Sequence, residues 1–268
     1  MSAAGPSSSV PPDHRTLISR LAACGIPSPE ADVRWLLEAF EDDLVALEAA
    51  VRRREQREPL QLILGTAAFR YIDVVVRPGV FIPRPETEIL AGLAIDRAAP
   101  GAVVLEPCTG TGAISCALAS EAQPSRVVAT DISAAAVDLA RLNAAPWPKI
   151  EVHHASLFTG VDPTLQGGVD VIVCNPPYLH PSQLADAEPE VAHHDPVQAL
   201  VGGATGWDVI ADLVTAAPHW LRRGGWVAIE DDPARVGQTA QALSHLVGPA
   251  TVHPDLTGRP RIALAQAR

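Results

Sequence analysis

The spacing of apolar residues divides the chain into a helical first part and a longer part in which helices and strands alternate. In the first part the apolar positions recur mainly at helical spacing. The elements expected there are a helix over residues 15–23, a helix from Pro29 behind the capping Ser28, a helix from Asp43 to about Gln56, and a strand over residues 71–76. The three arginines at residues 52–54 are expected to form a solvated face of the third helix.

From residue 86 onward, short apolar runs alternate with helical patterns. The expected helices cover residues 87–97, 113–122, 134–143, 207–221 and 233–246, and the expected strands cover residues 103–105, 126–130, 150–153, 169–174 and 226–229, with two closing strands near Thr251 and Ile262. This alternation is typical of a doubly wound α/β fold with a parallel sheet, in which ligands bind at the carboxyl ends of the strands.

The predicted organisation has four parts. Residues 1–12 are rich in Ser, Pro, Ala and Gly, which predicts a disordered tail. Residues 13–65 are expected to form a helical domain, and residues 66–85 a linker with a β-hairpin before the turn at Pro78 and Gly79. Residues 86–268 are expected to form the α/β domain.

A glycine turn follows the first strand of the α/β part. Gly110 and Gly112 allow the backbone to approach a ligand closely, and the helix after them offers free N–H groups to a carboxylate. The next strand ends in Asp131, about 20 residues after the turn, where a carboxylate can bind two ribose hydroxyls. The turn has neither a lysine to bind phosphate nor the third glycine of a dinucleotide site. It therefore favours S-adenosylmethionine over NAD or ATP.

The tetrapeptide Asn175-Pro176-Pro177-Tyr178 directly follows the apolar run at residues 169–174. The Asn175 side-chain oxygen and the Pro176 carbonyl can accept the two hydrogens of a planar amide or amine nitrogen, which aims its lone pair at a methyl donor. The two prolines restrict the backbone, and Tyr178 offers a flat face for stacking. Four residues alone also fit a plain proline-rich turn, but the glycine turn upstream favours methyl transfer to nitrogen.

Composition narrows the class of protein. At 268 residues and 47% apolar, the chain can bury one α/β core and a small accessory domain. No apolar run approaches the roughly 18 residues that span a membrane, so we expect a soluble, cytoplasmic protein. We also expect it to be a monomer. A net charge of −11 argues against direct nucleic-acid binding. No metal site is expected: adjacent histidines on a strand point to opposite faces, and the four cysteines fit no metal spacing and are expected to be reduced.

Together with these motifs, segments from residue 34 to residue 259 resemble the HemK-type protein glutamine methyltransferases, which modify the glutamine of the GGQ motif in peptide chain release factors. The segments that carry the resemblance are residues 34–37, 57–65, 69–70 and 78–88, the glycine turn, Asp131, residues 175–178, Pro196, residues 199–200, 202–203, 255–256 and 258–259. The resemblance implies a class I S-adenosylmethionine-dependent methyltransferase with a seven-stranded, mostly parallel sheet, an antiparallel edge hairpin, and a helical domain that recognises a protein substrate.

The resemblance also assigns roles to residues of this chain. The residues implied to bind S-adenosylmethionine are Glu106, Pro107, Cys108, Thr109, Gly110, Thr111, Gly112, Asp131, Ile132, Ser156, Leu157 and Asn175. The glutamine amide would be held by Asn175, Pro176, Pro177 and Tyr178, and the site would also be lined by Phe81, Arg84, Pro85, Glu86 and Thr87.

Several positions depart from the family pattern. They are Glu106 in place of aspartate, Cys108 in place of the first glycine, Ser156 and Thr205 each in place of aspartate, and a shorter, more acidic stretch at residues 230–233 in place of a glycine-containing loop. Lys149 is the only lysine, which indicates a GC-rich, actinobacterial-type source. These departures suggest a divergent branch and leave three alternatives open: an N-methyltransferase of secondary metabolism, an adenine-specific nucleic-acid methyltransferase, and a non-catalytic binding module.

Overall fold

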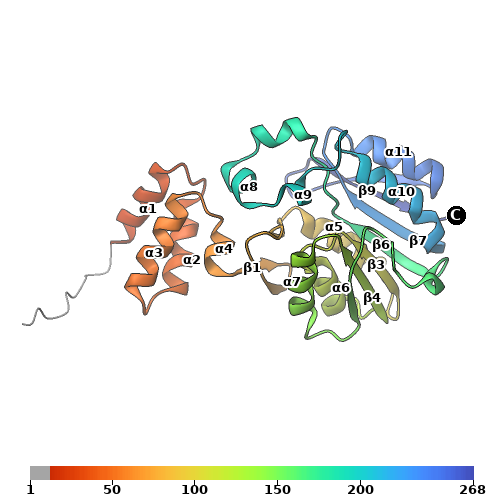
Figure 1. Ribbon diagram of the computed structural model, residues 1–268, viewed down its shortest axis with the longest axis horizontal. Helices are drawn as coiled ribbons and strands as arrows, with labels where there is room; N and C mark the ends of the chain where they lie inside the picture. Colours follow the sequence, from red (N-terminus) through yellow and green to blue (C-terminus); the bar gives the residue numbers. More distant parts are fainter. Residues whose placement is uncertain (1–12) are drawn as a thin grey trace, which may run out of the picture. The chain divides into compact units, whose positions relative to one another are not determined.

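The computed structural model describes residues 13–268 (Figure 1). The disorder expected of residues 1–12 lies outside the described residues. The chain divides into two compact units: the first ends at Gly65, and the second runs from Thr66 to Arg268. The segment at residues 66–85, expected as a linker, therefore falls within the second unit. No helix in the described part of the chain is both long and apolar enough to cross a membrane.

The first unit consists of helices. They are α1 (His14–Ala23), α2 (Pro29–Ala39), α3 (Leu44–Glu55) and α4 (Leu60–Leu64). Leu17 and Leu21 of α1 pack with Leu36 of α2 and Leu47 of α3 in one apolar core, as their helical spacing predicts. The five-residue α4 was not expected, because one helical turn and a half is too short to show a period.

Helices α2 and α3 begin at residues that the sequence predicts, but Ser28 does not cap α2 as expected. The Asp43 carboxylate accepts hydrogen bonds from the backbone N–H groups of Val45 and Ala46, at 3.0 and 2.9 Å, and so caps α3. Ser28 occupies the N-cap position of α2, but its side chain makes no capping hydrogen bond. The start of α2 thus rests on Pro29, whose backbone angle is preset for the first helical turn.

The expectation of a solvated arginine face on α3 is wrong at Arg54. This side chain is buried, and its Nε donates to the Asp32 carboxylate of α2 at 2.7 Å. Three consecutive residues on a helix point in different directions, so one of them faces the neighbouring helix.

The second unit contains a hairpin and a seven-stranded sheet. Its strands are β1 (Thr66–Phe69), β2 (Ile72–Val75), β3 (Val103–Pro107), β4 (Arg126–Asp131), β5 (Ile150–His154), β6 (Val169–Cys174), β7 (Leu221–Glu230), β8 (Ala250–Pro254) and β9 (Pro260–Gln266). The hairpin pairs β1 with β2, and the sheet has the order β5-β4-β3-β6-β7-β9-β8. Within the sheet β9 runs antiparallel to both of its neighbours, and the other pairs are parallel. The predicted α/β fold with an antiparallel edge is confirmed.

Helices cover both faces of this sheet (Figure 1). They are α5 (Thr87–Ile95), α6 (Ala113–Glu121), α7 (Ala134–Ala144), α10 (Asp208–Trp220) and α11 (Val236–Leu246). Helices α5, α6 and α7 pack side by side on one face, and α10 and α11 pack together on the other. The chain leaves the centre of the sheet in two opposite directions, and crossovers between parallel strands are right-handed. The helices of the two halves therefore lie on opposite faces of the sheet. Covered on both faces, the central strand β6 is apolar almost throughout, and Val171, Ile172 and Val173 are fully buried.

Two predicted boundaries differ from the structure. Strand β7 begins at Leu221, five residues before the expected start, because its first part pairs with Val169 across a register shift although its sequence is polar and glycine-rich. Helix α11 begins at Val236 instead of Pro233, because Asp232 caps a turn through its carboxylate, which accepts from the Ala234 N–H at 2.8 Å. Between β6 and α10 the structure also has short helices that were not expected: η2 (Pro181–Asp186), α8 (Pro189–His194) and α9 (Val197–Leu200).

The order of the strands creates a switch point at the centre of the sheet. From β3 the chain moves outward through β4 to β5, whereas from β6 it moves the opposite way to β7. Helices therefore leave the carboxyl ends of β3 and β6 toward opposite faces, and a crevice opens between those ends. The glycine turn follows β3 and Asn175 follows β6, so the fold brings the two sequence motifs to the same crevice.

Candidate active site

A cavity of about 480 Å³ lies at the carboxyl ends of β3, β4 and β6, a volume that suits a small organic ligand. The residues expected at the site that line it are Phe81, Arg84, Thr87, Glu106, Cys108, Thr109, Gly110, Thr111, Asp131, Ile132, Ser156, Leu157, Asn175, Pro176, Pro177 and Tyr178. Pro85, Glu86, Pro107 and Gly112 do not belong to its lining.

One wall of the cavity was not expected from sequence. It is formed by Val191 and by residues 196–201, which include the short helix α9. Phe69 of the hairpin strand β1 also reaches the cavity. Phe69, Pro196, Ala199 and Leu200 lie within the segments of the family resemblance, which is the signal that could have identified them. Nothing in the sequence marks Val191.

The two glycines of the turn have different roles. A Cβ placed on Gly110 would meet no atom within 4 Å, so the absent side chain leaves room for a ligand on the cavity side. A Cβ on Gly112 would lie 3.2 Å from the Ala140 side chain, so this glycine lets α6 pack closely on α7. Cys108 has φ of +58°, the left-handed region that costs a residue with a Cβ about 1–2 kcal/mol. The departure from glycine at this position therefore introduces backbone strain.

Asp131 links the end of β4 to the glycine turn. One carboxylate oxygen accepts from the Gly110 N–H at 2.9 Å, and the other accepts from the Ser133 N–H at 2.9 Å. Burial raises the pKa of Asp131, and these backbone hydrogen bonds oppose the rise. Each oxygen keeps a further lone pair, and the residue lines the cavity, so the carboxylate can accept hydrogen bonds from a diol.

Glu106 lies deeper, at the floor of the cavity. It is 1% exposed and accepts a hydrogen bond from the Ser115 hydroxyl of α6. Burial raises the pKa of Glu106 to about 8, and the hydrogen bond from Ser115 opposes the rise. At neutral pH the side chain is thus mainly neutral in the free protein, and a cationic ligand group beside it would favour its ionised form.

The amide of Asn175 is oriented by a relay of two side chains. Its Nδ2 donates to the Thr87 hydroxyl oxygen at 3.1 Å, and the Thr87 hydroxyl donates to the Glu230 carboxylate at 2.9 Å. With Nδ2 directed at Thr87, the side-chain oxygen Oδ1 is turned the opposite way. The relay therefore presents Asn175 as a hydrogen-bond acceptor.

Glu230 and Arg261, which were not expected at the site, support Tyr178 from behind. The Tyr178 hydroxyl lies 3.4 Å from the Glu230 carboxylate, and the Arg261 guanidinium lies 5.8 Å from the ring centroid. Glu230 is 2% exposed, and burial raises its pKa to about 7. The sequence identified Glu230 only as the first residue of an unusual acidic loop. It did not reveal a role at the site, because the contacts of Glu230 to Thr87 and Tyr178 join distant parts of the chain.

Arg84 contacts the residue directly before the cavity wall at residues 196–201. Its guanidinium forms an ion pair with the buried Asp195 and lies 5.0 Å from the ring centroid of Phe81.

Among the described residues no three His, Cys, Asp or Glu side chains are grouped so that they could hold a metal ion.

Comparison with known proteins identifies the family. Residues 74–194 match the model of the methyltransferase small domain. The chain is 43% identical to the release factor glutamine methyltransferase of Mycolicibacterium smegmatis, in an alignment of 265 residues that covers 91% of this chain and 93% of that protein. This chain belongs to the release factor glutamine methyltransferase family. The family member from Streptomyces coelicolor is 40% identical, with 92% of this chain and 94% of that protein covered.

A solved methyltransferase shows the same fold. The 16S rRNA N2 G1207 methyltransferase of T. thermophilus, solved with AdoMet and guanosine, superposes with a TM-score of 0.54 at 19% identity, covering 76% of this chain and 50% of that one. The class I methyltransferase fold and the family resemblance expected from sequence are thus both confirmed.

Proposed function

We propose that this release factor glutamine methyltransferase family member transfers a methyl group from S-adenosylmethionine to the side-chain amide nitrogen of a glutamine, the one in the GGQ motif of a peptide chain release factor. The observation that carries the proposal is the relay from Glu230 through Thr87 to Asn175, because it turns an amide oxygen toward an acceptor at the switch point of the sheet. Family membership at 43% identity supports the choice of a release factor as the acceptor.

The cavity fits the cofactor. The open space at Gly110 admits a ligand against the backbone, and the Asp131 carboxylate suits the two hydroxyls of a ribose. Ile132 and Leu157 offer apolar contact to an adenine, while Glu106 lies where an ionised carboxylate would favour a cationic amine. When bound, S-adenosylmethionine supplies an electrophilic methyl group on sulfur.

The acceptor side works by orientation. The Asn175 Oδ1 and the Pro176 carbonyl accept the two N–H hydrogens of the glutamine amide, and Tyr178 packs its ring against the amide plane. This grip directs the nitrogen lone pair at the methyl group, and closure of the site excludes water. The mechanism requires no strong general base, because the amide proton is lost to a carbonyl or to solvent after the methyl group has moved.

The three alternatives receive less support. Cys108 and Ser156, which motivated a non-catalytic module, line the cavity of about 480 Å³ without filling it. A net charge of −11 disfavours an adenine-specific nucleic-acid enzyme. The two relatives described above are both release factor glutamine methyltransferases, which disfavours an acceptor from secondary metabolism. We also propose that the helical unit ending at Gly65 recognises the protein substrate; a cytoplasmic monomer remains a prediction.

The test is methyl transfer from labelled S-adenosylmethionine to a purified release factor. The matched control is the same release factor with alanine in place of the GGQ glutamine, which should accept no label. Asn175→Ala should lower kcat at least about 100-fold, because the acceptor is no longer oriented, while the cofactor Kd changes less than about twofold. Label on the control factor, or an unchanged kcat in Asn175→Ala, would contradict the proposal.

A further inference from the structure

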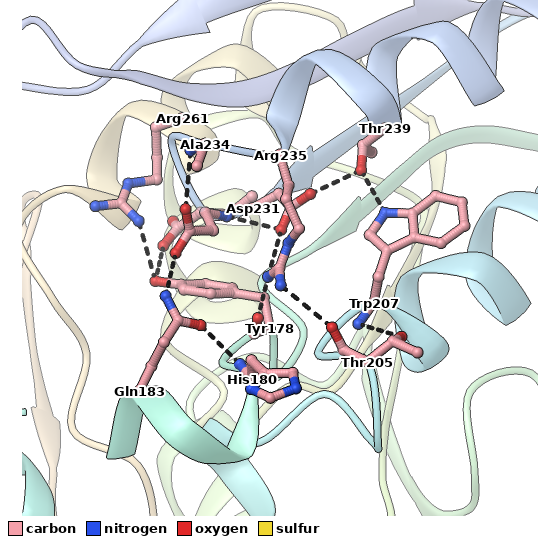
Figure 2. Close-up of polar contacts among 12 residues, drawn as sticks. Tyr178, His180, Gln183, Thr205, Trp207, Asp231, Ala234, Arg235, Thr239 and Arg261 are labelled. Carbon is pink, nitrogen blue, oxygen red and sulfur yellow. Dashed lines mark hydrogen bonds and ion pairs between the residues drawn. The ribbon is translucent and has the colours of Figure 1, made fainter. Parts of the chain in front are cut away.

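A partly buried polar cluster connects the start of α11 with the tetrapeptide at residues 175–178 (Figure 2). We call it the Arg235 cluster; it comprises Arg235, Asp231, Thr239, Thr205 and Trp207. Two of these positions, 205 and 231, are among those at which the chain departs from the family pattern. In the structure the carboxylate of Asp231 and the main-chain carbonyl of Thr205 both contact Arg235.

Arg235 contacts the main chain of the acceptor segment. Its Nη2 donates to the carbonyl oxygen of Tyr178, and its Nη1 lies 3.5 Å from the carbonyl oxygen of Thr205. Its Nε is buried without a hydrogen-bond partner among the described residues.

Asp231 holds the guanidinium in place. Its side chain is fully buried, and one oxygen lies 3.4 Å from Arg235 Nη2. The other oxygen accepts from the Thr239 hydroxyl at 2.8 Å, and that hydroxyl oxygen accepts from the Trp207 indole N–H at 2.8 Å. Asp231 directly follows β7, Trp207 and Arg235 are the N-cap residues of α10 and α11, and Thr239 lies within α11. These positions on regular elements hold Arg235 beside Tyr178.

The backbone around Tyr178 is close-packed. A Cβ on Gly202 would lie 2.5 Å from the Pro177 carbonyl oxygen, and one on Gly206 would lie 2.7 Å from the His180 nitrogen. The Leu179 N–H donates to the Leu200 carbonyl at 2.8 Å. The acceptor segment thus lies directly against residues 200–206, which Arg235 also contacts.

We propose that Arg235 is a positioning residue for the acceptor site. The prolines at 176 and 177 fix two backbone angles, so the tetrapeptide moves nearly as one rigid unit. Its orientation is then set at its two ends: at Asn175 by the end of β6, and at Tyr178 by the bond from Arg235 to the carbonyl. Fixing the second end directs the Pro176 carbonyl and the Tyr178 ring. The inference rests on the proposed function for its effect on rate.

Three variants test it in the full chain. Arg235→Gln removes the donor to Tyr178, and Arg235→Lys keeps a single cationic donor. Arg222→Gln is the control, because Arg222 also pairs with a carboxylate, that of Asp170, but on the half-exposed far end of β7. Methyl transfer to a GGQ-bearing release factor gives kcat and KM, cofactor titration gives Kd, and hydrogen exchange is followed at the Leu179 and His180 amides.

Arg235→Gln should lower kcat about 10- to 100-fold with little change in KM or cofactor Kd, and should speed exchange at Leu179 and His180 at least about tenfold. Arg235→Lys should lie between this variant and wild type in both kcat and exchange, and Arg222→Gln should match wild type. If Arg235→Gln does not fold, Arg235→Lys replaces it in the test. A kcat and an exchange rate equal to those of wild type in Arg235→Lys would then overturn the inference.

Other outcomes also decide. A lower kcat without faster exchange, or faster exchange without a lower kcat, overturns the inference, because rate and main-chain order would then be unconnected. A wild-type chain that does not methylate the release factor refutes the proposed function instead. In that case the positioning role is decided by exchange alone, measured on Arg235→Gln and Arg222→Gln.

Discussion

Replacing Glu106 by glutamine removes a buried titratable group while keeping the size of the side chain and an oxygen that can accept from Ser115. The pKa of Glu106 is raised by burial from 4.5 to about 8 in the folded protein. The folded state therefore prefers the neutral form, and ionisation favours unfolding. The stability that Glu106 contributes is fully present below pH 4.5 and is lost as the pH rises through about 8.

The magnitude follows from the two pKa values. A rise from 4.5 to about 8 corresponds to about 5 kcal/mol once the pH exceeds both values. Within this window the free energy of unfolding falls by about 1.4 kcal/mol per pH unit on account of Glu106. Between pH 6 and pH 8 the Glu106→Gln variant should thus gain about 2 kcal/mol of stability relative to wild type.

Urea unfolding of the free protein at several pH values between 6 and 8 measures this difference. Glu230, whose pKa is raised to about 7, titrates in the same range but is present in both proteins, so its effect cancels. The expected result is a difference between variant and wild type that grows with pH. A difference that stays constant would show that Glu106 is already ionised in the folded state and would refute the reasoning from burial.

Other substitutions probe the same site. Thr87→Val breaks the relay to Asn175 and should lower kcat about tenfold or more while cofactor Kd is unchanged; an unchanged kcat would remove Thr87 from the relay. Cys108→Gly should be more stable than Cys108→Ala by about 1 kcal/mol in urea unfolding, because φ is +58°, and the reverse order would contradict the strain. Asp131→Ala should weaken cofactor binding about 10- to 100-fold by calorimetry, and an unaltered affinity would exclude Asp131 from the cofactor site.

Local sequence predicted the elements that are buried on both faces or bounded by strong turn residues. Strand β6 occupies the predicted residues 169–174, because an apolar run in the middle of a parallel sheet needs no alternation to be seen. The glycine turn and the tetrapeptide at residues 175–178 were also recognisable, since each motif is contiguous. The order of the strands brings these two motifs together. The alternation of helices and strands was enough to predict that both motifs lie at the same edge of the sheet.

The polar groups behind the site depended on the tertiary structure. Asn175 meets Thr87, Thr87 meets Glu230, and Arg235 meets Tyr178, although each pair is far apart in the chain. Arg54 likewise is buried only because α2 supplies Asp32. A side chain's periodicity tells which face it occupies but not which partner it meets there. The sequence by itself thus determined the fold and the proposed acceptor segment. Packing between distant elements decided which side chains contact that segment, because hydrogen bonds depend on distances that only the folded chain defines.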